Sequence, residues 1–381
     1  MKYLFQLGHQ PHISTAELDA VFLHKHIRTS AHTHVGTYLI LESNDLRDSQ
    51  KLLEQLGGTI KIGKEIDLHK SAEQSISDFL HEKTEGKIHF SISGDNAKTA
   101  ALAVKKNLKS LGKSVRFIEP KNTATILHNN LIEKKGDFTI VGKDVFVTVA
   151  IQDIEEFTKR DFDRPGSDSF SGMIPPKLAR IMINLAQVDH NSIILDPFCG
   201  SGTVLTEALS MGYTNLIGSD ISEKAIADTK KNIEWLQSNF KSLDPDLGFQ
   251  ISNFKLFISP AQSINKIISK PGIEAIITEP YLGKPLKGNE TRSQLEKQAE
   301  ELKQLYIDSF KSFKQALKLK GVIVFIFPKF KYKDEWISTF PREQLKQEGF
   351  SIQPLNKDNE SLLYHRPKQH LGREIHRLIK K

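Results

Sequence analysis

The segment formed by residues 192–209 constrains the fold of this chain most, because an apolar run passes through a glycine turn into a helix-forming stretch. Residues 192–195 are typical of a buried strand, and residues 204–209 are typical of a helix. Gly200 and Gly202 lack Cβ atoms, so the backbone can turn sharply and a ligand can lie against it, while the helix start adds unpaired N–H groups. This order predicts a ligand-binding loop at a strand end.

The residues of this loop favour a nucleoside cofactor over a phosphate. The loop lacks the Gly-Lys-Ser/Thr ending of phosphate loops and the third glycine of the dinucleotide pattern. Asp196 at the strand end would repel phosphate, whereas it suits a sulfonium amino acid. A purely structural turn is the alternative for a bare Gly-x-Gly, and the longer Asp-Pro-Phe-Cys-Gly-Ser-Gly-Thr string disfavours it. The expected cofactor contacts from this loop are Asp196, Pro197, Phe198, Cys199, Gly200, Gly202 and Thr203.

A second acidic residue follows the next strand. Residues 215–219 end in Asp220, about the spacing at which nucleoside-binding α/β folds place a ribose-binding acid. A carboxylate there can accept both ribose hydroxyl protons, and Ile221 beside it is expected to join the cofactor site. Because a helix begins at Ser222, Asp220 as a helix cap is the alternative, and both roles can coexist.

Strands and helices alternate through the third part of the chain, which predicts a mostly parallel sheet with helices on both faces. Ligands of such sheets bind at the carboxyl ends of the strands, where Asp196, Asp220 and residues 278–281 fall. Residues 349–354 and 361–365 are expected to form a closing antiparallel pair. The other expected strands are 254–258, 273–277 and 321–326.

Two smaller α/β modules are expected before this sheet, the second with a basic helix over residues 97–111. The expected domain organisation is 1–65, 66–151, a polar linker at 152–168, and 169–381.

Composition describes an ordinary soluble protein, with 38% hydrophobic residues and a mean hydropathy of −0.36. The longest apolar runs, such as residues 322–327, are shorter than the roughly 20 residues that cross a bilayer. No membrane association and a cytoplasmic location are expected, since no signal cleavage pattern follows Met1. The one cysteine, Cys199, excludes internal disulfides and cysteine-based zinc sites, and no histidine spacing suggests a metal site.

Basic residues cluster in the second module. Residues 98–143 contain ten Lys or Arg and three acids, a local excess of seven that equals the net charge of the whole chain. A charge run is most often a solvated face, so nucleic-acid binding and a plain surface both remain open. The candidate RNA-binding residues are Lys98, Lys105, Lys106, Lys109, Lys113, Arg116 and Lys121.

The turn Thr278-Glu279-Pro280-Tyr281 carries the candidate catalytic residues. An exocyclic base amine is a poor nucleophile because its lone pair is delocalised into the ring, and acceptors that hold its N–H protons favour the reactive form. Glu279 and a neighbouring carbonyl can supply them. Tyr281 can stack on the base, which is worth roughly 1–3 kcal/mol and offsets part of the cost of extruding it. A proline turn that merely ends a strand is the alternative.

At this point the chain resembles the THUMP-containing tRNA guanine-N2 methyltransferases, the group that modifies guanosine 10 of tRNA. The motifs that carry the resemblance are residues 196–203, the Pro280-Tyr281 turn, residues 160–179, and the segments 7–17, 56–62 and 364–373. The likeness therefore runs through nearly the whole chain.

The resemblance implies an α/β protein with an N-terminal ferredoxin-like domain (1–65), a THUMP RNA-binding domain (66–151) and a Rossmann-like methyltransferase domain. It implies S-adenosylmethionine as the cofactor and methyl transfer to the N2 amine of a guanosine in tRNA, at position 10. Met173 and Pro175, with Gly172 and Pro176, are expected over the methionine end of the cofactor. A small activating protein remains an open question, and a monomer is the default expectation.

Two departures from the family pattern leave alternatives open. The family turn is usually Asp-Pro-Pro-Tyr, so either Thr278 or Glu279 takes the place of the acid, and Glu279 is favoured. The acid that usually receives the adenine amine is missing from residues 258–263, and Ser259 or a backbone group is expected to substitute.

Other functions remain compatible with the sequence. Guanine-N2 methylation of ribosomal RNA or adenine-N6 methylation of DNA would use the same fold, and an RNA-binding protein with a degenerate site would explain the altered turn. Cytosine-C5 methylation is excluded because it needs a cysteine nucleophile near the base, and Cys199 lies in the cofactor loop.

Overall fold

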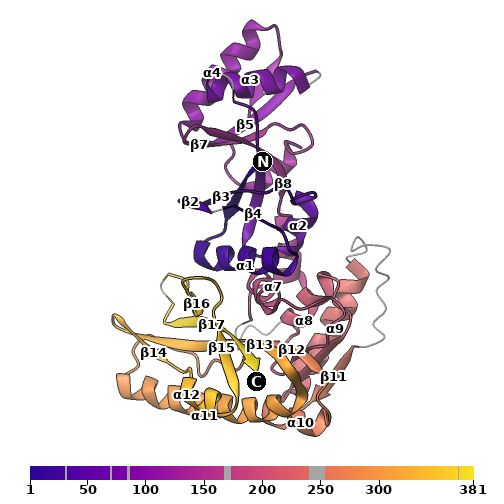
Figure 1. The fold of residues 1–381 in the computed structure, drawn as a ribbon, viewed down its shortest axis with the longest axis vertical. Coiled ribbons are helices and arrows are strands. Elements are labelled where there is room, and N and C mark those ends of the chain that lie inside the picture. The colour runs from indigo at the N-terminus through magenta and orange to yellow at the C-terminus, as the bar shows by residue number, and fades with distance from the viewer. Residues whose placement is uncertain (31, 69–70, 84–85, 167–172, 240–253, 368) are drawn as a thin grey trace. The chain divides into compact units, whose positions relative to one another are not determined.

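The computed structural model describes residues 1–381 except 31, 69–70, 84–85, 167–172, 240–253 and 368 (Figure 1). The chain forms two compact units. One contains residues 1–15 and 25–156, and the other contains residues 16–24 and 157–381.

The first unit is built on an eight-stranded sheet with the order β2-β3-β1-β4-β8-β7-β5-β6. Its strands are β1 (Lys2–Leu7), β2 (Thr33–Val35), β3 (Tyr38–Glu42), β4 (Thr59–Glu65), β5 (Ile88–Gly94), β6 (Val115–Phe117), β7 (Asp137–Val141) and β8 (Asp144–Ile151). The helices along this stretch are α1 (Pro11–His24), α2 (Ser49–Gln55), α3 (Ala72–Lys83), α4 (Ala97–Ser110) and α5 (Thr123–His128). The basic helix expected over residues 97–111 is therefore confirmed as α4.

This sheet is continuous across the boundary expected at residue 65. Strand β4 pairs with β1 on one edge and with β8 on the other, both antiparallel. A buried ion pair joins the two parts of the sheet, with Lys61 Nζ 2.9 Å from Asp137 Oδ2. Asp137 also accepts hydrogen bonds from Ser91 and Thr148, so its buried charge is compensated. The division into 1–65 and 66–151 stays a prediction.

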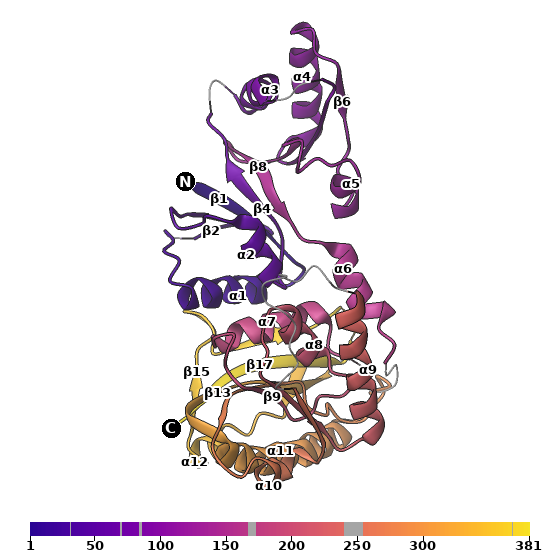
Figure 2. The ribbon, with the colours of Figure 1, turned by 90° about the vertical axis from the view of Figure 1, so that its right-hand side faces the viewer.

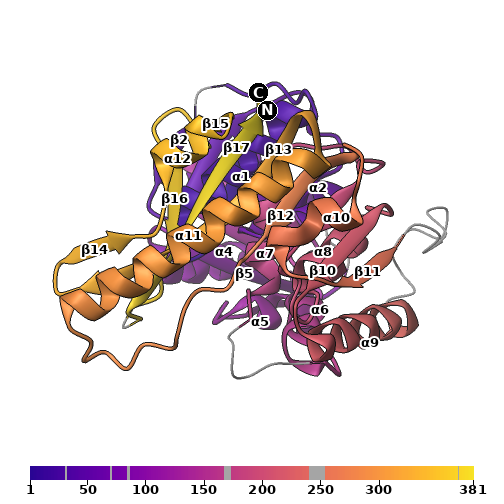
Figure 3. The ribbon, with the colours of Figure 1, turned by 90° about the horizontal axis from the view of Figure 1, so that it is seen from below.

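The second unit carries a sheet with the order β11-β10-β9-β12-β13-β17-β15, and β14 and β16 pair with β13 and β17 (Figure 3). Its strands are β9 (Ile194–Asp196), β10 (Leu216–Asp220), β11 (Lys255–Ile258), β12 (Ile273–Thr278), β13 (Leu317–Tyr332), β14 (Glu335–Ser338), β15 (Phe350–Gln353), β16 (Ser361–Tyr364) and β17 (Leu371–Lys380). The pairs from β11 to β13 are parallel, and β17 is antiparallel to its neighbours. The predicted α/β class is confirmed, but the expectation of a mostly parallel sheet is not, because four strand pairs are parallel and four, those of β13 with β14 and of β17 with β13, β15 and β16, are antiparallel.

Helices cover both faces of this sheet (Figure 2). The helices are α6 (Ile154–Thr158), α7 (Pro176–Ala186), α8 (Thr203–Ser210), α9 (Glu223–Asn239), α10 (Ile264–Ile267), α11 (Arg292–Ala316) and α12 (Arg342–Gln347), with a π-helical turn at Lys159–Asp163 and a 3-10 turn at Ala261–Ser263. In the main core, Tyr306 of α11 packs edge-on against Phe325 and Phe327 of β13, and Phe310 of α11 packs edge-on against Phe325. This core fixes the strand ends that bear the candidate site.

The expected pairing of residues 349–354 with 361–365 is wrong. The corresponding strands, β15 and β16, each pair antiparallel with β17, which the sequence analysis did not predict. Strand β17 lies against the edge of β13 and so provides the free edge that β15 and β16 need. Its residues Ile375 and Leu378 are fully buried on opposite faces of the strand, and its basic residues obscure this strand in the sequence.

Candidate active site

The glycine turn joins β9 to α8 as the sequence predicts. Gly200 has a φ of +53° and Gly202 a φ of +84°, in the left-handed region that favours glycine. A Cβ on Gly202 would lie 2.8 Å from the Thr229 side chain, so this glycine lets α9 pack closely. A Cβ on Gly200 would meet no protein atom within 4 Å, which leaves the backbone open to a ligand.

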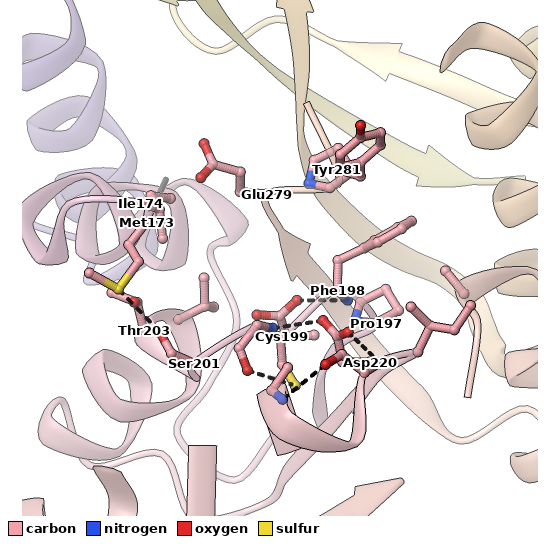
Figure 4. Close-up of a pocket in the computed structure, with 18 of the residues that line it drawn as sticks. Met173, Ile174, Pro197, Phe198, Cys199, Ser201, Thr203, Asp220, Glu279 and Tyr281 are labelled. Carbon is pink, nitrogen blue, oxygen red and sulfur yellow. Dashed lines mark hydrogen bonds between the residues drawn. The ribbon is translucent and has the colours of Figure 1, made fainter. Parts of the chain in front are cut away.

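Asp220, at the end of β10, holds this loop in place. Its Oδ2 accepts a hydrogen bond from the Gly200 amide at 3.0 Å, and its Oδ1 accepts one from the Ser222 amide at 2.9 Å (Figure 4). Asp220 therefore fixes the loop and the residue before α9, while the helix itself is capped by the Ser222 hydroxyl, which accepts a hydrogen bond from the Ala225 amide at 3.2 Å. An ionised carboxylate has about four acceptor positions, so both oxygens keep capacity for ligand hydroxyls.

Asp196, at the end of β9, is almost fully buried. Its Oδ1 accepts hydrogen bonds from the Thr278 hydroxyl at 2.6 Å and from the Phe198 amide at 3.2 Å. Burial raises the pKa of the Asp196 carboxyl to about 7, and the two hydrogen bonds oppose that rise. The nearby charges of Asp220 and Glu279 raise it further. A cation placed beside Asp196 would restore its ionised form.

A cavity of about 440 Å³ opens beside these residues, within the roughly 300–1,000 Å³ of small-molecule sites. Figure 4 shows Glu279 and Tyr281 on one side of it, Met173 and Ile174 on another, and the loop with Asp220 on a third. The predicted site residues that line it are Met173, Asp196, Pro197, Phe198, Cys199, Gly200, Thr203, Asp220, Ile221, Glu279, Pro280 and Tyr281.

Five residues expected at the cofactor or the acceptor base do not line this cavity: Thr278, Ser259, Pro175, Pro176 and Gly202. Thr278 is fully buried behind it, and Ser259 is buried with its hydroxyl donating to the Pro260 carbonyl. Pro175 and Gly202 are the N-cap residues of α7 and α8. The lining residues that the sequence analysis did not name as contacts are Ile174, Ser201, Val204, Ser222, Lys224, Ala225, Asp228, Pro260, Ala261, Gln262, Leu282 and Leu305. Of these, Ser222, Lys224 and Ala225 could have been sought at the first turn of the helix predicted to follow Asp220.

The turn after β12 presents a carboxylate and an aromatic ring to the cavity. Arg373 Nε of β17 lies 2.5 Å from Glu279 Oε1. Burial raises the pKa of Glu279 above its usual range, and the charge and hydrogen bond of Arg373 oppose that rise. The Tyr281 side chain is 52% exposed, and its backbone carbonyl accepts a hydrogen bond from the Tyr306 hydroxyl at 2.7 Å. Tyr281 thus has a fixed backbone and an accessible ring.

Three arginines in or next to the family-like segment 160–179 contact helix α8. Arg160 and Arg180 both pair with the buried Glu207, at 2.7 and 2.8 Å. Arg164 donates hydrogen bonds to the Thr203 hydroxyl and to the Met173 sulfur. These contacts place Met173 at the cavity. Gly172 lies outside the described residues.

The seven basic residues proposed to contact RNA belong to the first unit. Four lie on α4, Arg116 lies on β6, and Lys113 and Lys121 lie in the adjoining loops. Lys98 pairs with Glu119 at 3.7 Å, and both side chains are largely exposed. The side chains classed as exposed are Lys98, Lys106, Lys109, Arg116 and Lys121. Contact of these residues with RNA stays a prediction.

Among the described residues, no helix combines the length and apolarity needed to cross a membrane. The same residues contain no group of three or more His, Cys, Asp or Glu side chains placed to hold a metal ion.

The chain is similar to several known proteins in sequence and in fold. Residues 36–231 match the family model described as DNA methylase. The tRNA (guanine(10)-N2)-dimethyltransferase of Methanothermobacter thermautotrophicus is 35% identical over 33% of this chain and 30% of its own length. That of Methanocaldococcus jannaschii is 31% identical over 48% of this chain and 47% of its own length. The chain thus spans less than half the length of these curated relatives. The structure of TrmN from Thermus thermophilus matches over the full length of both chains with a TM-score of 0.55 and 14% identity, which shows a shared fold.

Proposed function

The chain belongs to the DNA methylase family, and from this premise we propose that it transfers a methyl group from S-adenosylmethionine to the exocyclic N2 amine of a guanosine in tRNA. The names of the two archaeal relatives favour position 10. The observation that carries the proposal is the shared cavity, which joins the glycine loop and two acids to Glu279 and Tyr281. The protein would act in the cytoplasm as a monomer, with a ferredoxin-like domain over residues 1–65 and a THUMP domain over residues 66–151 that binds the tRNA.

The residues around the cavity fit the proposed cofactor. Asp220 keeps acceptor positions for a ribose diol, and Gly200 leaves space beside its backbone. Asp196 suits the positive charge of a sulfonium amino acid because a buried carboxylate without a cation is costly. For the adenine, the structure offers Ile221, Pro260, Ala261 and Gln262 at the cavity wall in place of Ser259.

The residues at the turn account for the chemistry of the acceptor. When bound, S-adenosylmethionine supplies an electrophilic methyl group on a positively charged sulfur. Tyr281 is placed to stack on an extruded base, and Glu279 is placed to accept a hydrogen bond from its amine. As nitrogen bonds to the methyl carbon and the carbon–sulfur bond breaks, the amine loses a proton, which Glu279 can receive. Most of the rate enhancement would come from positioning the two reactants.

Nucleoside mass spectrometry tests this proposal. An unmodified tRNA transcript incubated with the protein and methyl-labelled cofactor should yield labelled N2-methylguanosine or N2,N2-dimethylguanosine. Glu279→Gln and Tyr281→Ala should lower turnover by roughly tenfold or more and leave tRNA binding within a few-fold. Leu319→Ala is the matched control, because Leu319 is exposed and does not line the cavity. Wild-type turnover in both site variants would contradict the assignment of the acceptor site.

Methylation of DNA is the second candidate, because the matching family model is described as DNA methylase. A DNA duplex and a ribosomal RNA fragment incubated under the same conditions distinguish these substrates. Label in N6-methyladenine from DNA, with none in tRNA, would replace the tRNA proposal. Calorimetry that shows no S-adenosylmethionine binding would instead favour a non-catalytic RNA-binding protein.

A further inference from the structure

We propose that Arg373 is a positioning residue for methyl transfer, which holds the Glu279 carboxylate through one oxygen and leaves the other for the acceptor amine. The inference rests on the function proposed above and deepens it. It explains how Glu279, in a turn that differs from the family's Asp-Pro-Pro-Tyr, can accept a hydrogen bond from the amine. Arg373 does not line the cavity, so it acts through Glu279.

The contact is short, shielded and held by two strand pairings. The Arg373 and Glu279 side chains are 11% and 8% exposed, and Nε lies 2.5 Å from Oε1. Strand β13 pairs in parallel with β12, which ends just before Glu279, and antiparallel with β17, where Arg373 lies opposite Pro328. The sheet therefore delivers both partners although they are 94 residues apart.

To accept a hydrogen bond and then a proton from the base amine, Glu279 must be ionised and held in one orientation. Burial by itself favours the neutral acid, which accepts an N–H hydrogen bond less strongly than the carboxylate and cannot take up the proton that the amine loses. Arg373 opposes this effect and keeps the pKa of Glu279 lower than burial alone would set it. Its hydrogen bond to Oε1 also restrains rotation of the carboxylate, so that the same oxygen faces the cavity in each turnover.

Single-turnover methylation of an unmodified tRNA transcript, measured as a function of pH, tests the inference. In Arg373→Gln the rate at neutral pH should fall roughly tenfold or more and recover in part as pH rises, because Glu279 then ionises only at higher pH. Arg373→Lys should restore part of the rate, since it returns the charge without the guanidinium geometry. The double variant Glu279→Gln/Arg373→Gln should be no slower than Glu279→Gln and should show no recovery at high pH.

Lys329→Gln provides a matched control on the same two strands. Lys329 of β13 and Glu374 of β17 form an ion pair at 2.7 Å, with Glu374 9% exposed, and neither lines the cavity. Loss of this pair should lower the melting temperature and leave the pH profile of methyl transfer unchanged. A pH shift of the same size in Lys329→Gln would show that Arg373 acts only through stability, which overturns the inference.

Unfolding of the cofactor-free protein gives a second readout that does not depend on activity. A carboxyl whose pKa is raised in the folded state binds more protons folded than unfolded, so stability falls as pH rises through that pKa. Arg373→Gln should therefore lose more stability with rising pH than the double variant does. Absence of methylation by the wild type would overturn the proposed function, while this comparison would still test the coupling. An active wild type whose pH profile is unchanged by Arg373→Gln would overturn the inference alone.

Discussion

The Thr278 hydroxyl donates a hydrogen bond to Asp196 across two adjacent strands, with Oγ1 and Oδ1 2.6 Å apart. Thr278 follows four buried residues of β12, and Asp196 ends β9, which pairs with it. The first residue of the Thr278–Tyr281 turn therefore supports the cofactor side of the cavity, while the others face the proposed acceptor. One strand end thus connects the two halves of the site.

Replacement of Thr278 by valine should weaken binding of S-adenosylmethionine. Valine keeps the shape but removes the donor, so the pKa of Asp196 rises and less of it is ionised at neutral pH. Hydrogen bonds to charged groups are worth about 1.5–3 kcal/mol, which corresponds to a Kd increase of about tenfold or more. Titration calorimetry measures the change. Thr278→Ser keeps the hydroxyl and should bind as the wild type does; equal weakening by both variants would contradict this role.

Cofactor affinity should fall as the solution is made more acidic than pH 7. Binding of a cation requires ionised Asp196, and its pKa is about 7 in the free protein. Well below that value Kd should rise by about tenfold for each pH unit, because a proton must be released on binding. Calorimetry in buffers of different ionisation enthalpy counts that proton. Asp196→Asn should bind weakly at every pH, and a variant with the wild-type pH slope would refute the assignment.

The same carboxyl should make the cofactor-free protein less stable as pH rises from its usual pKa of 3.8 to about 7. The pKa of Asp196 is higher in the folded state than its usual value, so the folded state binds the extra proton. Its contribution to stability is present at low pH and is lost as pH rises through about 7. Denaturant unfolding of the wild type against Asp196→Asn should show this difference in slope. Parallel curves would mean that Asp196 titrates normally.

Changing Gly202 to alanine should mainly affect stability, whereas changing Gly200 to alanine should mainly affect cofactor binding. Gly202→Ala adds strain at φ +84° and a contact of 2.8 Å with Thr229, so it should mainly lower the melting temperature. Gly200→Ala adds strain alone and places a methyl group beside open space, so it should mainly weaken cofactor binding. Gly112→Ala is the control, since Gly112 has φ +76° and equal space but lies in the first unit. The idea fails if Gly112→Ala weakens cofactor binding as much.

Removal of charge from the first unit should weaken tRNA binding and make it less dependent on salt. A variant with Lys98, Lys106, Lys109 and Arg116 changed to glutamine should lower the salt slope by about 0.7–0.9 for each phosphate that is no longer neutralised. The control changes the same number of charges on α11, at Lys297, Lys303, Lys311 and Lys314. Filter binding across a salt series measures both. Equal slopes for the two variants would indicate that the basic cluster is only a solvated surface.

Most single elements could be predicted because their signals are local. Turn residues and apolar periodicity bracket β9, α8, β10 and β12, and the acids at the strand ends follow from the same pattern. The cavity gathers Asp196, Asp220, Glu279 and Tyr281 because parallel strands bring their carboxyl ends to one edge.

What could not be predicted depends on pairing between distant segments. Strand β17 could not be distinguished from a basic tail, so its partners β15 and β16 were paired with each other. The contact of Arg373 with Glu279 spans 94 residues and has no local signature. Ser259 was expected at the cofactor, but its hydroxyl turns to the Pro260 carbonyl and the next residues take the cavity wall. The direction of a loop after a strand is not encoded in residue type.

The antiparallel pairing of β4 with β8 limits how the first 151 residues can be divided into fragments. A fragment that starts at residue 66 would leave the edge of β8 without its partner, and a bare strand edge invites association with other chains. The same fragment would lack Lys61, so the buried carboxylate of Asp137 would lose its ion-pair partner. The residues on both sides of position 66 therefore belong to one sheet, and a fragment that starts at residue 66 is expected to aggregate.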